Sequence, residues 1–289
     1  MNRRDLLKGV ALGAVALSLG TRSLSVSAAS LEPRLAELER QRGGRLGVSI
    51  LDTGNGQRLA YRGGERFLMC STFKLLAVAA VLTRVDRGQE RLDRRIVFGK
   101  DVVLSYAPVT SLHVGRQGMT VAELCQAAIT VSDNTAANLL LTSMGGPSAV
   151  TTFARSLADT VTRLDRTEPE LNDGAPGDLR DTTTPDAMLG NLQKLLLGDV
   201  LAETSRGQLE TWLRATSTGN SALRAGMPQG WTVGDKTGSG SHGERNDVAI
   251  VWPPQRKPIL IAAYYANPSV DDTARNKVLA DVGRIAAGI

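Results

Sequence analysis

The chain has 289 residues, a formal net charge of +5, and 42% hydrophobic and 22% charged residues. This length suffices for one large domain or two packed lobes, and the composition excludes a mainly disordered chain. The first 29 residues carry four basic side chains against one aspartate, so +3 of the charge belongs to them. The residues after 29 are too weakly basic to indicate a nucleic-acid partner, and the sequence contains no basic run with interleaved aromatic residues.

Residues 1–29 have the pattern of an export signal. Arg3 and Arg4 precede an uncharged apolar run over 9–20 and small residues over 25–30. This is the pattern of a cleaved signal, and the apolar run is too short to span a bilayer. The paired arginines resemble a twin-arginine signal, and a buried N-terminal helix is the alternative. We therefore expect a periplasmic protein with no stable membrane association after cleavage.

The next segments predict a helix followed by a hairpin. Apolar residues at helical spacing predict a helix over 31–42, and Gly43-Gly44 is a plausible stop. Strand-like runs over 46–51 and 57–61, with turn residues between them, predict two paired strands.

The middle of the chain, from about 65 to 214, has mainly helical patterns. Thr120 and Glu123 form a predicted capping box, and Pro185 opens a predicted helix over 185–197. A further predicted helix begins near Ser71.

The C-terminal part predicts strands over 231–233, 248–252 and 259–265, and a closing helix over 272–287. Strands at both chain ends predict an α/β (α+β) fold with one five-stranded antiparallel sheet flanked by helices and an all-helical lobe inserted in the middle. The expected sheet lobe comprises 30–64 and 215–289, and the expected helical lobe comprises 65–214. The cleft between two lobes is a common place for an active site.

Ser71 and Lys74 are three residues apart, so both face one side of the first helical turn. A serine hydroxyl needs a neighbouring base to act as a nucleophile. A lysine can be that base if burial or cationic neighbours lower its pKa. For this pair alone, a capping serine beside a solvated lysine is the simpler alternative.

Two further motifs add polar groups. Ser-Asp-Asn at 132–134 lies between two predicted helices, where a hydroxyl and a carboxamide can point into a cleft, although it is also good N-cap material. Lys-Thr-Gly at 236–238 ends a predicted strand, where its side chains can meet a substrate carboxylate and its backbone N–H groups can polarise a carbonyl. An ordinary hairpin turn is the alternative.

In this order and spacing, the three motifs resemble those of class A β-lactamases and penicillin-binding proteins, over residues 31–289. A fourth motif, Glu-Pro-Glu-Leu-Asn at 168–172, resembles the class A omega loop, here 163–181. A carboxylate with an amide nearby can activate a hydrolytic water, which favours the hydrolase. For Glu170, simple solvation stays open.

The resemblance implies a serine β-lactamase that hydrolyses penicillins and cephalosporins through an acyl-enzyme and confers antibiotic resistance. Ser71 would attack the β-lactam carbonyl, and the N–H groups of Ser71 and Ser239 would form the oxyanion hole. Either Lys74, or Glu168 through a water, would accept the serine proton. Ser132 would relay a proton to the ring nitrogen.

The resemblance also implies the substrate-binding and supporting residues. Lys236, Thr237 and Arg245 would hold the substrate carboxylate, on the same strand region as Gly238 and Ser239. The remaining implied residues are Asn134 for the acylamido group, Asn172 beside Glu168, Tyr106 at the cleft entrance, Asn138 in support of Glu168, and the loop-closing pair Arg166 and Asp181.

The chain departs from the family at its cysteines. Cys70 has no partner because the matching position is Gly240, and Cys125 has none because Val78 stands near its partner position. We expect both thiols to be free and buried. Two histidines and two cysteines are too few for a convincing zinc site. We expect no cofactor, and a monomer whose partner is the small-molecule substrate.

Two other functions share most of these residues. A peptidoglycan DD-peptidase would use the first three motifs but leaves the omega-loop motif unexplained. A penicillin-sensing module would stay acylated, and such modules are normally tethered to a membrane segment.

Overall fold

The computed structural model of the chain describes residues 32–175 and 177–289. The expected export signal therefore lies outside the described residues. Within the described part, no helix has both the length and the apolar character needed to cross a membrane.

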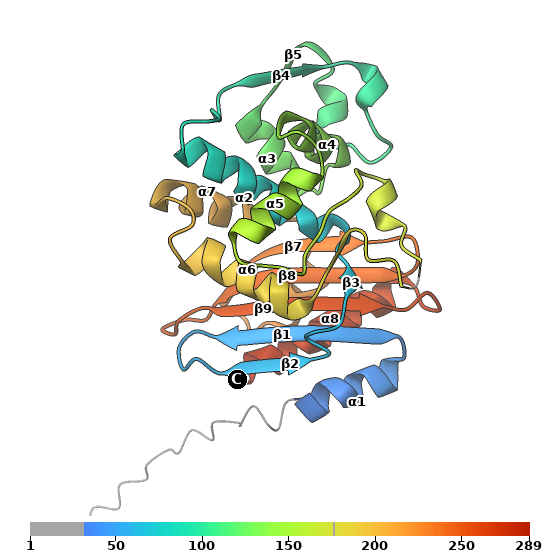
Figure 1. Cartoon of the computed structure of the whole chain (residues 1–289). Coiled ribbons are helices and arrows are strands. Elements are labelled where there is room, and N and C mark those ends of the chain that lie inside the picture. Colours follow the sequence, from blue (N-terminus) through green and yellow to red (C-terminus); the bar gives the residue numbers. More distant parts are fainter. Residues whose placement is uncertain (1–31, 176) are drawn as a thin grey trace, which may run out of the picture.

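One five-stranded antiparallel sheet forms the centre of the molecule, with strand order β2-β1-β9-β8-β7 (Figure 1). Both ends of the chain contribute, because β1 pairs with β9 along its whole length. The predicted five-stranded antiparallel sheet is confirmed. The strands are β1 (Arg45–Asp52), β2 (Arg58–Tyr61), β7 (Thr232–Ser239), β8 (Glu244–Trp252) and β9 (Ile259–Ala266).

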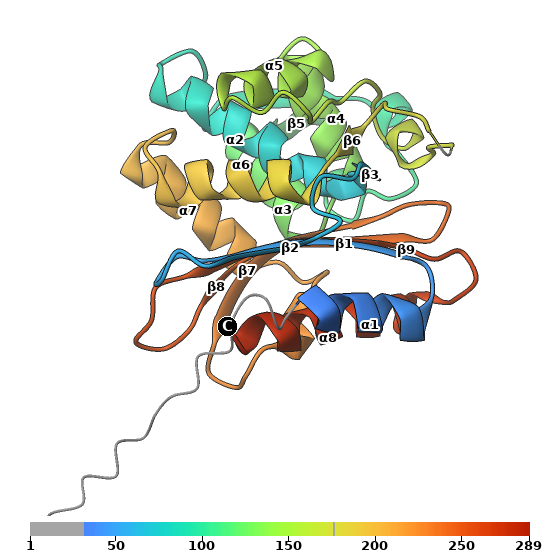
Figure 2. The same ribbon diagram turned by 60° about the horizontal axis from the view of Figure 1, so that its bottom comes forward.

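Helices cover both faces of the sheet. Helices α1 (Glu32–Arg42) and α8 (Asp272–Ala287) lie on one face, and the other helices lie on the opposite face (Figure 2). Along β8, alternate residues enter two different cores: Ala249 and Val251 pack toward α8, whereas Val248 and Ile250 pack toward α2. This alternation follows from the period of two in a strand.

The middle segment of the chain folds mainly into helices, as predicted. They are α2 (Phe73–Asp86), α3 (Val121–Thr130), α4 (Asn134–Ser143), α5 (Ser148–Ser156), α6 (Pro185–Leu197) and α7 (Glu203–Arg214). In α2 every residue from Phe73 to Thr83 is buried, so this helix is the centre of its layer. The predicted capping box at Thr120 and Glu123 is formed at the start of α3.

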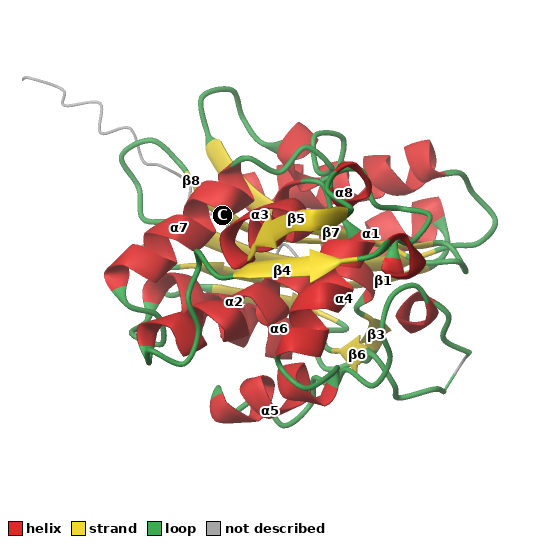
Figure 3. Cartoon of the chain, turned by 90° about the horizontal axis from the view of Figure 1, so that it is seen from above, coloured by secondary structure: helices red, strands yellow, loops and turns green. Residues whose placement is uncertain are grey.

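The segment also contains two short ladders, which the helical patterns did not predict. Strands β3 (Phe67–Leu68) and β6 (Thr182–Thr183) pair, as do β4 (Arg95–Phe98) and β5 (Gly115–Thr120), seen from above in Figure 3. The first pair is two residues long and the second has a register shift. Strands β3 and β6 are too short to give a readable alternation of apolar residues, and β5 contains only one apolar side chain, Met119.

Candidate active site

Ser71 lies in a short 3-10 turn, η2 (Cys70–Thr72), that leads directly into α2. The turn is held against the sheet because Asn246 Nδ2 on β8 donates to Leu68 O and Met69 O at 2.9 and 3.2 Å. Strand β7 also packs closely here, since a Cβ at Gly238 would lie 3.1 Å from Ser71 N. A glycine at this position therefore brings the strand backbone beside Ser71.

Cys70 has a positive φ of 46°, which turns the chain just before Ser71. A non-glycine residue in this region is uncommon and is often found at functional sites. Both cysteines are free and buried, as predicted. Burial raises the pKa of the Cys70 thiol, so it is a poor nucleophile.

Lys74 is completely buried, one turn along α2 from Ser71. Its Nζ lies 3.0 Å from Ser71 Oγ and 2.9 Å from Glu168 Oε1. It also donates to Asn134 Oδ1 at 2.6 Å and to Ser132 O at 2.9 Å. Burial lowers the pKa of Lys74, and the Glu168 carboxylate opposes that shift.

Glu168 reaches Ser71 from the omega loop. Ser71 Oγ donates to Glu168 Oε1 at 3.1 Å, and Asn172 Nδ2 donates to Glu168 Oε2. The Glu168 backbone is fixed by Asn138, which accepts from Glu168 N at 2.9 Å and donates to Glu168 O at 2.8 Å. The carboxylate is thereby placed within reach of both Ser71 and Lys74.

Ser132 lies between two buried lysines. Lys74 Nζ is 3.3 Å and Lys236 Nζ 3.0 Å from its hydroxyl. Lys236 otherwise donates only to Thr237 O, at 2.8 Å, among the described residues. Burial lowers the pKa of Lys236 to about 7, and the charge of Lys74 adds to the effect. The Ser132 hydroxyl therefore connects two groups that can carry a proton.

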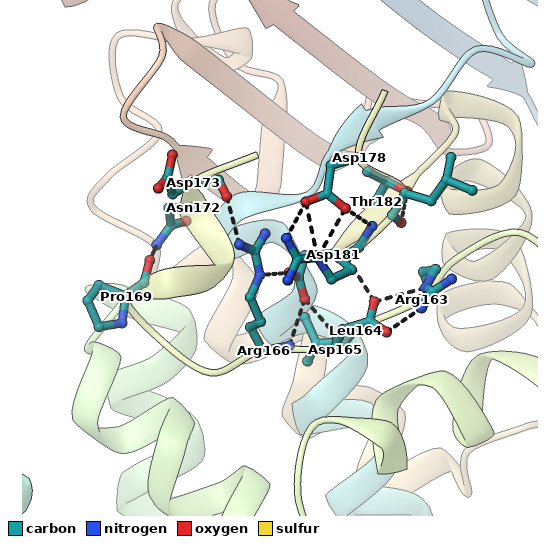
Figure 4. Close-up of polar contacts among 12 residues, drawn as sticks. Arg163, Leu164, Asp165, Arg166, Pro169, Asn172, Asp173, Asp178, Asp181 and Thr182 are labelled. Carbon is teal, nitrogen blue, oxygen red and sulfur yellow. Dashed lines mark hydrogen bonds and ion pairs between the residues drawn. The ribbon is translucent and has the colours of Figure 1, made fainter. Parts of the chain in front are cut away.

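The omega loop is closed by a buried ion pair (Figure 4). Arg166 Nε lies 2.6 Å from Asp181 Oδ2, and Asp181 Oδ1 accepts from the backbone N–H groups of Asp165 and Arg166. Arg166 also donates to Asp173 O at 2.8 Å. These bonds tie both ends of the loop together and fix the segment that carries Glu168.

Asp133, the central residue of its motif, supports the cleft from beneath. Its carboxylate caps α4 through Ala136 N at 2.8 Å and accepts from Val109 N and Thr110 N at 3.0 and 2.9 Å. Tyr106 stands at the entrance, half exposed, and its carbonyl accepts from Asn134 N at 3.1 Å. The motif thus joins the start of α4 to the segment that carries Tyr106, on this side of the cleft.

Arg245 lies on β8 directly opposite Ser239 on β7. Its guanidinium donates to Ser239 Oγ at 2.8 Å and to Thr218 O at 3.1 Å. Thr218 also shares a hydrogen bond of 2.6 Å with the Thr237 hydroxyl. Sequence reasoning missed Thr218, because it lies in no motif and reaches the cleft from the loop after α7, through its bonds with Thr237 and Arg245.

The predicted residues surround one cleft of about 280 Å³. Lys74, Glu168 and Lys236 lie behind its wall, each within 3.1 Å of a lining hydroxyl. Asn138, Arg166 and Asp181 lie outside it and support the omega loop. The lining residues are Ser71, Tyr106, Ser132, Asn134, Asn172, Thr218, Thr237, Gly238, Ser239 and Arg245. The described residues contain no group of histidine, cysteine and acidic side chains suited to a metal ion.

Known proteins resemble this chain over nearly its whole length. A family model described as the β-lactamase enzyme family matches residues 30–288. β-Lactamase OXY-1 from Klebsiella oxytoca is 46% identical over 276 residues, which cover 96% of this chain and 94% of that protein. A β-lactamase from Citrobacter koseri is 48% identical and covers 88% and 86%.

Solved structures agree. The class A β-lactamase of the last common ancestor of Gram-negative bacteria (GNCA4) superposes with a TM-score of 0.87 at 62% identity, covering 89% of this chain and 97% of that one. This chain therefore belongs to the β-lactamase enzyme family, as a class A serine hydrolase that acts on the β-lactam amide.

Proposed function

We propose that Ser71 attacks the β-lactam carbonyl and forms the acyl-enzyme. The observation that carries this proposal is the contact of Ser71 Oγ with both Lys74 Nζ and Glu168 Oε1, at 3.0 and 3.1 Å. Either group can accept the serine proton, because both lie within hydrogen-bond reach and the 2.9 Å contact between them lets it pass from one to the other. The start of α2 favours negative charge developing near Ser71.

The amide nitrogen leaves with a proton delivered by Ser132. Its hydroxyl bonds both lysines, so a proton given to the ring nitrogen is replaced from Lys74 or Lys236. The backbone N–H groups of Ser71 and Ser239 form the oxyanion hole, supported by the close approach of β7 that Gly238 permits. One such donor is typically worth ~10²–10³ in rate.

Glu168 then activates the water that hydrolyses the ester. Asn172 orients its carboxylate, and Asn172 Oδ1 is buried with no hydrogen-bond partner within the described chain. That oxygen is available to accept a bond from a water held at Glu168. The Arg166–Asp181 pair keeps the loop closed over this position.

The substrate carboxylate binds where Lys236, Thr237 and Arg245 converge, with the Ser239 hydroxyl adding a bond. Arg245 and Lys236 supply the positive charge, and Thr237 and Ser239 supply hydroxyl donors. Asn134 bonds the acylamido group, and Tyr106 borders the entrance. Penicillins and cephalosporins share the carboxylate and the acylamido group that this arrangement recognises.

We further propose that residues 1–29 direct the protein to the periplasm and are then removed, and that the mature enzyme is a monomer. In this proposal, 30–64 and 215–289 form the sheet lobe and 65–214 the helical lobe. The pattern of residues 1–29 supports export, and the placement of the cleft supports the division into lobes.

Hydrolysis of a chromogenic cephalosporin by the purified protein tests the function. The wild type is expected to turn over many equivalents, and Ser71→Ala, with the nucleophile removed, none. Release of D-alanine from a D-Ala-D-Ala peptide without cephalosporin turnover would instead identify a peptidase. A single persistent equivalent of acylation would identify a sensor.

A further inference from the structure

Two buried aspartates lie side by side beneath the substrate-carboxylate site. Asp235 on β7 pairs with Ala249, and Asp247 on β8 pairs with Thr237, so the two are diagonal neighbours on one face of the sheet. Diagonal neighbours in an antiparallel pair are about 7 Å apart, within the combined reach of two aspartate side chains. Both residues have no solvent exposure.

Each carboxylate has one bonded oxygen and one orphan. Asp235 Oδ1 pairs with Arg224 of the 3-10 turn η6 (Leu223–Gly226), and Asp247 Oδ2 accepts from Leu223 N at 3.1 Å. Asp235 Oδ2 and Asp247 Oδ1 are buried and have no hydrogen-bond partner among the described residues. Gly219 packs so closely over Asp235 Oδ2 that a Cβ there would overlap it.

Two ionised carboxylates are poorly compensated at this position. The charged groups around the pair are Arg224 from η6, Lys236 from β7 and Arg245 from β8, whereas α8 contributes the neutral Asn276, which accepts from Arg245. Among the residues that the structure describes, only Arg224 forms an ion pair with either aspartate.

This environment raises the pKa of the Asp247 carboxyl more than that of the Asp235 carboxyl. Burial, followed by repulsion from Asp235, raises the pKa of the Asp247 carboxyl far above its usual range. Buried carboxyls that share a site commonly retain a proton for this reason.

We propose that Asp235 and Asp247 hold one proton between them at neutral pH, with the Asp247 carboxyl as its main carrier. The proton supplies the donor that the two orphan oxygens lack, and it reduces the charge of the pair from −2 to −1. Arg224 then balances the remaining charge. This inference deepens the proposed function, because the same face of β7 and β8 carries the groups that meet the substrate carboxylate.

Strand alternation places Thr237 and Ser239 on the same face of β7 as Asp235, and Arg245 on the same face of β8 as Asp247. A second negative charge on this face would repel the substrate carboxylate. At an effective dielectric constant of ~20 and a separation of ~10 Å, one unit charge changes binding by about tenfold. Protonation of Asp247 therefore spares the substrate carboxylate this repulsion.

The infrared carbonyl stretch of a protonated carboxylic acid tests the proton directly. The spectrum of the wild type at neutral pH is expected to contain this band, with its shift in heavy water, and Asp247→Asn is expected to lose it. The asparagine amide can accept from Leu223 N and donate toward Asp235, so this variant mimics the protonated acid.

Asp159→Asn is the matched control, because Asp159 is buried and both of its oxygens already accept bonds. This variant should keep the band. Absence of the band in the wild type, or an unchanged band in Asp247→Asn, would overturn the proposal.

The KM for benzylpenicillin gives a second readout, because it reports the net charge beneath the site of the substrate carboxylate. If Asp247 is already neutral, Asp247→Asn keeps the wild-type KM and kcat at neutral pH. If Asp247 is ionised, the variant removes a negative charge from the site, and KM falls by about tenfold; that result would overturn the shared proton.

Stability against pH provides an independent check. A carboxyl whose pKa is raised by folding costs stability as the pH rises from its unfolded value toward its folded value. The wild type should therefore lose stability relative to Asp247→Asn as the pH rises from the acidic range, where the carboxyl is protonated in both the folded and the unfolded state, toward neutral pH, and parallel curves would contradict the proposal. A normal hydrolase without these signatures refutes the shared proton alone, whereas a wild type without β-lactam turnover refutes the proposed function.

Discussion

Lys74 and Lys236 are both fully buried and both bond the Ser132 hydroxyl, yet their surroundings differ. Lys74 lies against a carboxylate, with its Nζ 2.9 Å from Glu168. The hydrogen-bond partners of Lys236 are the neutral oxygens of Ser132 and Thr237. Burial lowers the pKa of both lysines, but a contacting carboxylate opposes the shift only at Lys74. The difference suits Lys74 to exchanging protons within the site, and Lys236 to attracting an anion that arrives from outside.

The largest effect is expected from removing Lys74 from its contacts with Ser71 and Glu168. Lys74→Ala removes a group that bonds Ser71 and leaves Glu168 buried without its cation. General acid–base catalysis is typically worth ~10²–10⁴ in rate, so kcat/KM for benzylpenicillin should fall by that factor. Lys100→Ala, at an exposed position, is the matched control and should keep wild-type activity. A variant with wild-type turnover would remove Lys74 from the mechanism.

The next effect comes from loosening the loop that brings Glu168 to Lys74. Asp181→Asn should destabilise the protein by about 3 kcal/mol, because it removes one charge of a buried pair and leaves Arg166 uncompensated. Equilibrium unfolding in urea measures this change. Asp178→Asn breaks a more exposed pair with Arg180 in the same loop and should leave the unfolding curve nearly unchanged. Equal losses in both variants would show that the buried pair has no special role.

A smaller effect is expected from the loss of the Lys236 charge as the pH rises. Lys236 carries its charge below a pKa of about 7 and loses it above, so KM for an anionic β-lactam should rise with pH through that value. The rise is at most about tenfold per pH unit. In Lys236→Arg the guanidinium stays charged, so the rise in KM should disappear even if the variant is slower overall. A KM that is flat with pH in the wild type would place the charged anchor elsewhere.

The ends of helices were predictable from the sequence where a proline or glycine marks them. Pro185 at the first helical position fixed the start of α6, and the glycines after Arg42 marked the end of α1. The two short ladders were not predictable. Their pairing depends on segments more than 100 residues apart for β3 and β6, and on an irregular register for β4 and β5.

The candidate site was predictable where the motifs and the family resemblance carry it, and together they gave all but one of the cleft-lining residues. Thr218 was missed because it lies in a loop outside every motif, and only the folding of that loop over β7 brings it to Thr237. The positive φ of Cys70 and of Ser132 has no sequence signal either, since both are ordinary L residues held there by the surrounding packing. The Asp235–Asp247 pair likewise appears only when β7 and β8 are aligned.

The most direct test of the account is the intact mass of Glu168→Gln after mixing with benzylpenicillin. If Glu168 activates the deacylating water, the variant should accumulate protein heavier by one penicilloyl group, with the added mass mapping to the peptide that contains Ser71. Glu170→Gln, at an exposed position in the same loop, should turn over without accumulating the adduct. A Glu168→Gln protein that hydrolyses benzylpenicillin at the wild-type rate and shows no adduct would contradict the assignment of the hydrolytic step to Glu168.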